Sequence, residues 1–410
     1  MNRFLWAGAL GASLLVAVVL RQPMVGLLLA SSACVAAALG RSLRVLPWVV
    51  LALKLVLLGA VSLLVPVLWP EGGGLIPVNP DQHLYVETAN RIADALRVSP
   101  LSVDYAGIVG LHNRSYSVTL GWLAYLNGGG NLFLYRLFNV FISLLLAGLA
   151  YVLARRLYPR SLQAASLVFL GVAILPTVNA YSMFILRDVL IAAIVMSVAL
   201  GLFDRRHWLT IVGLVMAYFT RIQLFFLLVG AVALFAALRF VRRFGRYGPV
   251  LRGVLLAAFA IGGFYVAPLV LPPEYDYSHA SSLLSFGRFL VHLVPSLLGL
   301  DFLLVDPGSL ELGRSTLVAA RLLLVDAWLV PLLFLGIVVH YRRMESQWRE
   351  FYLWVWAVTI GYMAGYWIAY GTVFVRLLMP LYPLFLLAVP AVVLKGKSRG
   401  RGKALESVHG

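Results

Sequence analysis

A small set of ionisable and aromatic side chains borders the long apolar runs of this 410-residue chain. An ionisable group is costly at membrane depth, so one that is retained there is a candidate for function. A carboxylate can accept a proton from a reacting hydroxyl, and the planar fork of an arginine binds phosphate oxygens in pairs. The side chains that we consider for such chemistry are Asp81, His83, Tyr85, Arg187, Asp188, Arg221 and Arg376.

Three of these residues lie in one unusually polar segment, VNPDQHLYVETANRIADALR, residues 78–97. The segment directly follows the apolar run 45–69, in a chain that is 62% hydrophobic and only 12% charged. On a helix, one stripe carries apolar residues and another carries charges, which is typical of a helix lying flat in the membrane interface. The apolar stripe is predicted to hold Leu84, Ile92 and Leu96, and the charged stripe Glu87, Arg91 and Asp94.

The composition of the whole chain predicts a membrane protein. A mean hydropathy of +0.94 means more apolar surface than the core of a water-soluble protein of this size can bury. The apolar runs are too continuous for the alternating strands of a β-barrel, so the predicted fold class is all-α and polytopic. A single cysteine, Cys34, excludes a disulfide framework and a cysteine-based metal site.

About twelve membrane spans are predicted from the apolar runs. The first run passes through Arg21-Gln22-Pro23 into the second, so it is expected to be a retained helix rather than a cleaved signal. The seventh and eighth spans are short and could form one long or broken helix around Thr220-Arg221. The predicted spans are 4–20, 24–40, 45–69, 131–154, 162–180, 186–204, 208–219, 222–238, 253–271, 319–340, 352–371 and 374–394.

The distribution of basic residues predicts the orientation of these spans. With both termini in the cytoplasm, the cytoplasmic segments carry most of the lysines and arginines and few of the acids, as membrane insertion requires. The formal net charge of +17 is therefore a topology signal, and no nucleic-acid partner is expected. The basic tail 395–410 is expected to touch anionic lipid.

This topology puts two long loops, about 70–130 and 272–318, outside the cytoplasm together with the candidate residues. In the second loop, Ser281 to Leu300 is interrupted by Arg288, His292 and Pro295, and is predicted to be re-entrant or interfacial. High Leu, Val and Arg with low Lys suggests a GC-rich bacterial genome, so the inner (plasma) membrane is the expected location. Within the span 131–154, Arg136 and Asn139 are expected to meet a buried partner.

Four features follow one another along the chain. A DxxxY motif, Asp81 to Tyr85, follows a span that leaves the cytoplasm, and the long outer loop leads into YRLFNVFISLL. Asp188 lies in the next outer turn, and GLVMAYFTRIQLFFLLVG and VRLLMPLYPLFLLAVP each carry an arginine at the outer lip. In this order the features resemble the GT-C superfamily of membrane glycosyltransferases, and the likeness covers about residues 45–394. It leaves residues 1–44 as an added transmembrane hairpin and 395–410 as a cytoplasmic tail.

The resemblance implies transfer of a sugar from a polyprenyl phosphate or diphosphate donor to a glycan, lipid or protein acceptor on the extracytoplasmic face. It assigns the general base to Asp81 and the family's second acidic group to Asp188. Direct displacement of the phosphate would invert the anomeric centre. The residues expected to bind the substrate, its phosphate above all, are Arg187, Arg221, Arg376, Tyr85 and His83.

Two departures from the family pattern argue against a metal. Gln82 follows Asp81 where many relatives have a second acid, and Asp188 is preceded by an arginine. Hard cations prefer several oxygen ligands, so no metal ligands are assigned, and Mg²⁺ or Mn²⁺ stays open as an alternative cofactor.

Simpler roles stay open for each candidate. Asp81 could be only a helix cap, Arg187 and Asp188 a local ion pair, and the arginines at 221 and 376 anchors that reach lipid head groups. The outer histidines, His112, His279 and His292 among them, show no metal-binding spacing. Two other functions also compete: an O-antigen-type polysaccharide polymerase, and a lipid-linked glycan transporter or flippase, which predicts inverted repeats and broken midplane helices.

Overall fold

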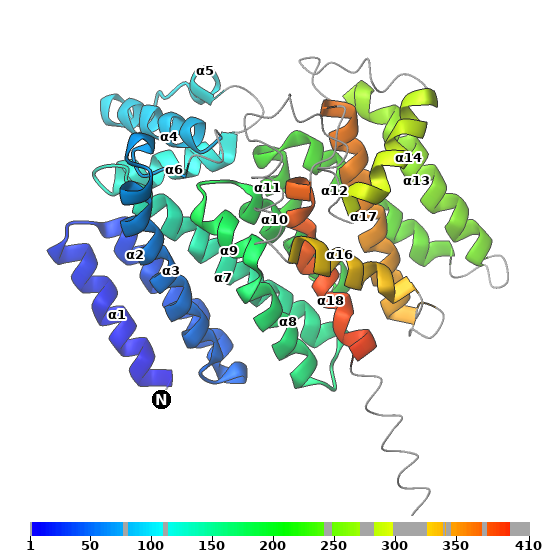
Figure 1. The fold of residues 1–410 in the computed structure, drawn as a ribbon, viewed down its shortest axis with the longest axis horizontal. Helices are drawn as coiled ribbons and strands as arrows, with labels where there is room; N and C mark the ends of the chain where they lie inside the picture. The colour runs from blue at the N-terminus through cyan, green and yellow to red at the C-terminus, as the bar shows by residue number, and fades with distance from the viewer. Residues whose placement is uncertain are drawn as a thin grey trace, which may run out of the picture. The chain divides into compact units, whose positions relative to one another are not determined.

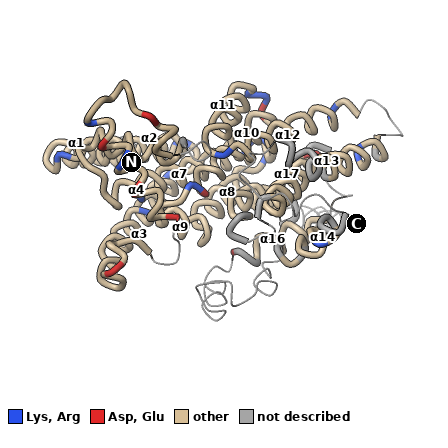
Figure 2. Tube along the Cα trace, turned by 90° about the horizontal axis from the view of Figure 1, so that it is seen from above, with Lys and Arg blue, Asp and Glu red and all other residues tan. Residues whose placement is uncertain are grey.

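The structure is a computed structural model that describes residues 2–76, 81–109, 114–241, 248–270, 283–297, 326–338, 341, 346–370 and 375–393. Every regular element within these ranges is a helix, which confirms the all-α prediction (Figure 1). Charged residues are sparse along most of these helices (Figure 2). Sparse charge and long apolar helices together identify a membrane-embedded protein.

Four described helices are long and apolar enough to cross a membrane, and a fifth span is formed if a bent pair is counted as one. The four are α2 (Pro23–Leu43), α3 (Leu46–Leu68), α7 (Leu132–Leu157) and α12 (Ile222–Val241). The bent pair consists of α8 (Leu162–Ile174) and α9 (Pro176–Met183), which meet at 42°.

Helices also lie within the other predicted spans, while the number of spans stays a prediction. Residues 208–238 form two helices rather than one, with Arg221 between them. The remaining elements at predicted spans are α1 (Asn2–Val19), α10 (Asp188–Phe203), α11 (His207–Thr220), α13 (Gly248–Val270), α16 (Asp326–Gly336), α17 (Ser346–Tyr370), the 3₁₀ helix η7 (Val375–Leu381) and α18 (Tyr382–Val393).

The chain divides into two compact units. The first unit comprises Met1–Tyr151, Phe169–Ile194 and Phe219–Arg221, and the second comprises Val152–Val168, Val195–Tyr218 and Ile222–Gly410. The predicted added hairpin, residues 1–44, belongs to the first unit. The predicted tail 395–410 lies outside the described residues, so the modules 1–44, 45–394 and 395–410 stay predictions.

In the first unit, α1 and α2 form a hairpin that packs beside α3 (Figure 1). The two helices approach closely at Gly26. A Cβ atom added there would lie 2.6 Å from both the Cβ of Ala17 and the carbonyl oxygen of Ser13. Small residues allow such close packing between helices in lipid, where van der Waals contact replaces the hydrophobic effect.

At the end of the first unit where α3 finishes lie the short helices of the first long loop (Figure 1). They are η1 (Pro70–Gly72), α4 (Asp81–Val98), α5 (Tyr105–Val109) and α6 (Arg114–Leu126). Helix α4 packs tightly on α6, because Gly121 leaves room for the side chain of Ile92. The segment 78–97 is therefore helical from Asp81 onward, as predicted, and it is amphipathic.

The predicted apolar stripe of α4 was wrong at one position. Ile92 and Leu96 are fully buried, but Leu84 is 57% exposed. At 3.6 residues per turn, position 84 lies roughly 80° from position 92 around the helix, whereas Tyr85 lies only about 20° away. Tyr85 therefore takes the buried place. On the charged stripe, Arg91 and Glu87 form an ion pair at 2.5 Å.

Aromatic packing holds the second unit together. The ring of Phe203 lies 4.8 Å from that of Phe235 and 5.1 Å from that of Phe351, both edge-on. The indole of Trp354, fully buried, donates a hydrogen bond of 3.1 Å to the carbonyl of Ala231. In this unit the predicted interfacial segment 281–300 contains α14 (Leu283–Leu297), with Arg288 exposed.

We predict that Gly26→Ala destabilises the protein by about 1–3 kcal/mol, because the new methyl group overpacks the α1–α2 contact. Gly59→Ala is the matched control: a Cβ atom added at Gly59, on α3, would meet nothing within 4 Å, and alanine favours a helix more than glycine does. Thermal unfolding in detergent measures both. A Gly26 variant as stable as the Gly59 variant would refute the close packing of α1 and α2.

Candidate functional site

The first part of the candidate site is the N-terminal turn of α4. Asp81 begins this helix, and Tyr85 follows four residues later, so the two side chains share one face. Asp81 is half-buried and Tyr85 is 4% exposed. His83 is exposed on a different face of the helix, so the structure does not bring it together with Asp81 and Tyr85.

The second part is a non-helical segment, Phe184–Arg187, which we call the connector because it joins α9 to α10. Helix α7 supplies hydrogen bonds to its carbonyls. The Asn139 side-chain amide donates to the carbonyl of Phe184 at 2.9 Å and to that of Leu186 at 3.2 Å. Backbone that leaves a helix in apolar surroundings needs such partners, so Asn139 stabilises the shape of the connector.

Arg136 binds the backbone just before the connector, and Gln82 binds the backbone within it. The Arg136 guanidinium donates to the carbonyl of Met183 at 3.0 Å and to that of Gly74 at 2.6 Å. The side-chain oxygen of Gln82 accepts from the Ile185 N–H at 3.5 Å, a long bond. The expectation that the polar residues of α7 meet a buried partner is confirmed. The partner is mainly backbone rather than another charged side chain.

The connector delivers Arg187 to the aromatic face of α4. The guanidinium carbon of Arg187 lies 6.0 Å from the centre of the Tyr85 ring, at the outer limit of a cation–π contact. The Tyr85 ring in turn meets Tyr116 of α6 edge-on, with centroids 5.1 Å apart and planes at 83°. The Tyr116 hydroxyl donates to the side-chain oxygen of Asn139 at 3.1 Å. Tyr85, which lies next to Arg187, is therefore linked through Tyr116 of α6 to Asn139 of α7.

Burial and neighbouring charge keep Tyr116 protonated. Burial raises the pKa of Tyr116 well above its usual range, the hydrogen bond to Asn139 lowers it, and the nearby Tyr85 and Asp188 raise it. Tyr116 is therefore a neutral hydrogen-bond donor at physiological pH. Asp188 is 4% exposed in the first turn of α10, where the helix dipole favours a negative charge.

Arg221 lies in the break between α11 and α12, in the first unit. Its neighbour Thr220 shares a hydrogen bond with Ser115 of α6, with the two hydroxyl oxygens 2.8 Å apart. Arg221 is only 7% exposed, which disfavours the simpler role of an anchor reaching for lipid head groups.

The remaining candidates lie elsewhere. Arg376 is in η7 of the second unit, and its side chain is outside the described residues, as are His112 and His279. His292 belongs to α14, where its ring lies 4.9 Å from that of Trp367. The first unit thus brings together Tyr85, Arg187 and Asp188, with Asp81 one turn before Tyr85 on the same helix face.

Sequence reasoning missed Tyr116 and gave Gln82 no structural role. Both are fully buried in the first unit. The available signal was the polar pair on the otherwise apolar α7, which required partners, but nothing in the sequence identified those partners. Among the residues that the structure describes, no group of three or more His, Cys, Asp and Glu side chains is arranged to hold a metal ion.

Comparison of the chain with protein-family models, curated proteins and solved structures gives no match.

We predict that Arg136→Met destabilises the protein by about 2–4 kcal/mol, because the buried carbonyls of Met183 and Gly74 lose their donor. Ser143→Ala is the control: Ser143 is also fully buried on α7, but its hydroxyl only bonds the carbonyl of Val140 in the same helix. Chemical or thermal unfolding in detergent compares the two variants. Equal stability of the two variants would contradict the role of Arg136 in holding the connector.

Proposed function

We propose that the protein is a glycosyltransferase that moves a sugar from a polyprenyl phosphate or diphosphate to a glycan, lipid or protein acceptor. The supporting observation is the gathering of Tyr85, Arg187 and Asp188 in the first unit, beside the face of α4 that begins with Asp81. A carboxylate near a guanidinium suits a reaction that removes a proton from one oxygen while negative charge develops on another.

The proposed setting is a GT-C-like module over residues 45–394 with about twelve spans in the whole chain. Both termini are placed in the cytoplasm of a bacterium, and the site faces the extracytoplasmic side of the inner membrane. Support comes from the distribution of basic residues and from the amphipathic helix α4, whose exposed Leu84 and charged stripe suit an interface.

In the proposed reaction, Asp81 takes the proton of an acceptor hydroxyl as that oxygen bonds to the anomeric carbon of the sugar. The bond between the anomeric carbon and the phosphate oxygen breaks, and the configuration inverts. The leaving phosphate gains negative charge, which Arg187 is placed to stabilise, because a guanidinium binds phosphate oxygens through paired donors.

Other candidates complete the proposed site. Arg221 binds further oxygens of the donor phosphate, and Tyr85 holds Arg187 by its ring face. Arg376 stays a candidate from the sequence alone. Asp188 orients the arginine beside it and is the second acidic group. A divalent cation, Mg²⁺ or Mn²⁺, stays an alternative that would use Asp81 and Asp188 as oxygen ligands.

A lipid-linked glycan flippase is the second candidate function, and one observation favours it. The span made of α8 and α9 is bent at Pro176, and the buried Lys54 of α3 donates to the Asn179 side chain beyond the bend, at 2.5 Å. A broken helix beside an ionisable group is typical of transport sites. A flippase moves the lipid-linked sugar across the membrane without transferring it.

We predict that Asp81→Asn lowers sugar transfer from a polyprenyl-linked donor by about 100-fold or more, because the amide cannot accept the proton. The control is Asp94→Asn, on the same helix, where the carboxylate pairs with Arg97 on the exposed surface. Transfer by purified protein in detergent or liposomes is measured with a radiolabelled donor. An Asp81 variant that transfers at the wild-type rate would falsify the general-base role.

A wild-type protein that moves the lipid-linked sugar across liposomes without transferring the sugar would favour the flippase.

We predict that Arg187→Ala raises the KM for the donor by about 10-fold or more and changes the KM for the acceptor less, because it removes a charged hydrogen-bond donor to the phosphate. Arg221→Ala is expected to act in the same direction. Arg91→Ala serves as the control, since that guanidinium pairs with Glu87 on the exposed stripe. Unchanged donor kinetics in Arg187→Ala would contradict phosphate binding by this residue.

A further inference from the structure

The side-chain amide of Asn139 uses all of its donors and its oxygen at the candidate site. Both N–H groups go to connector carbonyls, at 2.9 Å to Phe184 and 3.2 Å to Leu186, and the oxygen accepts from Tyr116 at 3.1 Å. An asparagine offers two donors and one carbonyl oxygen, so no N–H is left over. Asn139 is fully buried, which makes each of these bonds costly to lose.

The same three hydrogen bonds link the connector, which carries Arg187, to the aromatic face of α4. The Leu186 carbonyl belongs to the peptide group that enters Arg187, so the bond from Asn139 fixes the direction in which the connector continues. On the other side, Tyr116 packs its ring against Tyr85, the residue whose ring faces the Arg187 guanidinium. Tyr116 and Asn139 therefore relate the position of Arg187 to that of the aromatic face of α4.

We propose that Tyr116 and Asn139 are positioning residues, which hold Arg187 against Tyr85 at the place where the donor phosphate binds. This inference rests on the proposed function, since it gives Arg187 the phosphate of the donor. Neither residue touches the substrate. Their contribution is the fixed direction of one guanidinium, and a misplacement of about 1 Å can cost a large factor in rate.

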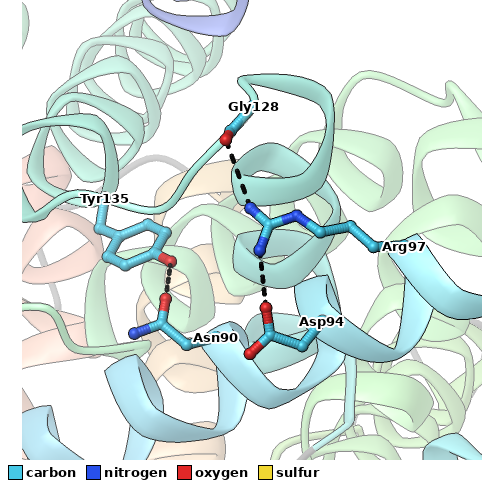
Figure 3. Close-up of polar contacts among 5 residues, drawn as sticks. All are labelled: Asn90, Asp94, Arg97, Gly128 and Tyr135. Atoms are coloured by element: carbon cyan, nitrogen blue, oxygen red, sulfur yellow. Dashed lines mark hydrogen bonds and ion pairs between the residues drawn. The ribbon is translucent and has the colours of Figure 1, made fainter.

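A second tyrosine of the first unit provides a matched control. Tyr135 of α7 is also fully buried, and its hydroxyl donates to the side-chain oxygen of Asn90 at 2.9 Å (Figure 3). Around it, Arg97 pairs with Asp94 at 2.6 Å and donates to the carbonyl of Gly128 at 3.3 Å. Tyr135→Phe thus removes the same kind of bond as Tyr116→Phe, at a place with no bond to the connector.

The experiment measures steady-state transfer from a polyprenyl-phosphate sugar by full-length variants. The single variants are Tyr116→Phe, Tyr135→Phe and Arg187→Ala. Each phenylalanine variant is also combined with Arg187→Ala. Tyr116→Phe keeps the buried ring and removes only the hydroxyl. We expect about a 10-fold higher KM for the donor in Tyr116→Phe and no more than a 2-fold change in Tyr135→Phe. In the Arg187→Ala background, Tyr116→Phe should cost almost nothing further, because its effect runs through Arg187.

Asn139→Asp tests the other half of the arrangement. The carboxylate still accepts from Tyr116 but cannot donate to the connector carbonyls, so the KM for the donor should rise at least as much as in Tyr116→Phe. Unfolding midpoints in detergent are recorded for all variants, and kinetics are expressed per folded protein. Tyr116→Phe leaves the oxygen of the buried Asn139 without its donor, whereas the Asn90 that Tyr135→Phe releases is exposed, so the unfolding midpoints show whether a difference in stability accompanies a change in KM.

The outcomes separate the inference from the proposed function. Equal donor KM values for Tyr116→Phe and Tyr135→Phe, or a full additional loss when Tyr116→Phe is combined with Arg187→Ala, would overturn the positioning role while transfer itself persists. A wild-type protein that gives no transfer would instead overturn the proposed function and the inference that depends on it, whereas an active Asp81→Asn variant would overturn only the general-base role.

Discussion

Polar backbone groups inside an apolar bundle must find partners within the protein, because no water is present there to bind them. Two asparagines of the described part of the first unit help to meet this constraint. Asn139 donates to two carbonyls of the connector, and Asn179 donates to the carbonyls of Ala173 and Leu175, at 3.2 Å and 3.1 Å, where the helix bends at Pro176. Asn139 and Asn179 thus lie on apolar helices because each binds backbone carbonyls where the chain leaves a regular helix.

The break in the helix at the connector determines where the charged side chains of Arg187 and Asp188 lie. Had α9 continued into α10 as one straight helix, the consecutive residues Arg187 and Asp188 would face directions set by the helical repeat alone. The break lets the chain turn, so Arg187 reaches the Tyr85 ring and Asp188 begins a new helix, where the dipole favours its charge. Both residues then lie close to Tyr85 and Tyr116, although these tyrosines belong to a distant part of the sequence.

Surface ion pairs contribute much less to this arrangement than the buried amides do. On α4, Arg91 and Glu87 have side chains that are 66% and 61% exposed, and exposed pairs of this kind contribute little to stability. The buried side chains of Gln82, Arg136 and Asn139 instead satisfy backbone groups that would otherwise be left without partners, a loss of about 1–3 kcal/mol for each group. The geometry of the candidate site therefore depends on neutral and charged donors to the backbone, and less on pairs of opposite charges.

The sequence by itself determined that the chain is helical and membrane-embedded, because long apolar runs can hide their backbone in lipid only as helices. It also predicted the amphipathic α4 and apolar segments in which helices lie, but it left open whether residues 208–238 form one helix or two. It misplaced Leu84 and could not identify Tyr116, since a helical stripe is defined only once a partner surface exists. Only the tertiary structure decided that Arg136 and Asn139 bind the connector and that Arg187 faces Tyr85. Hydrogen bonds between residues far apart along the chain leave no local pattern, so their partners become visible only when the helices are packed.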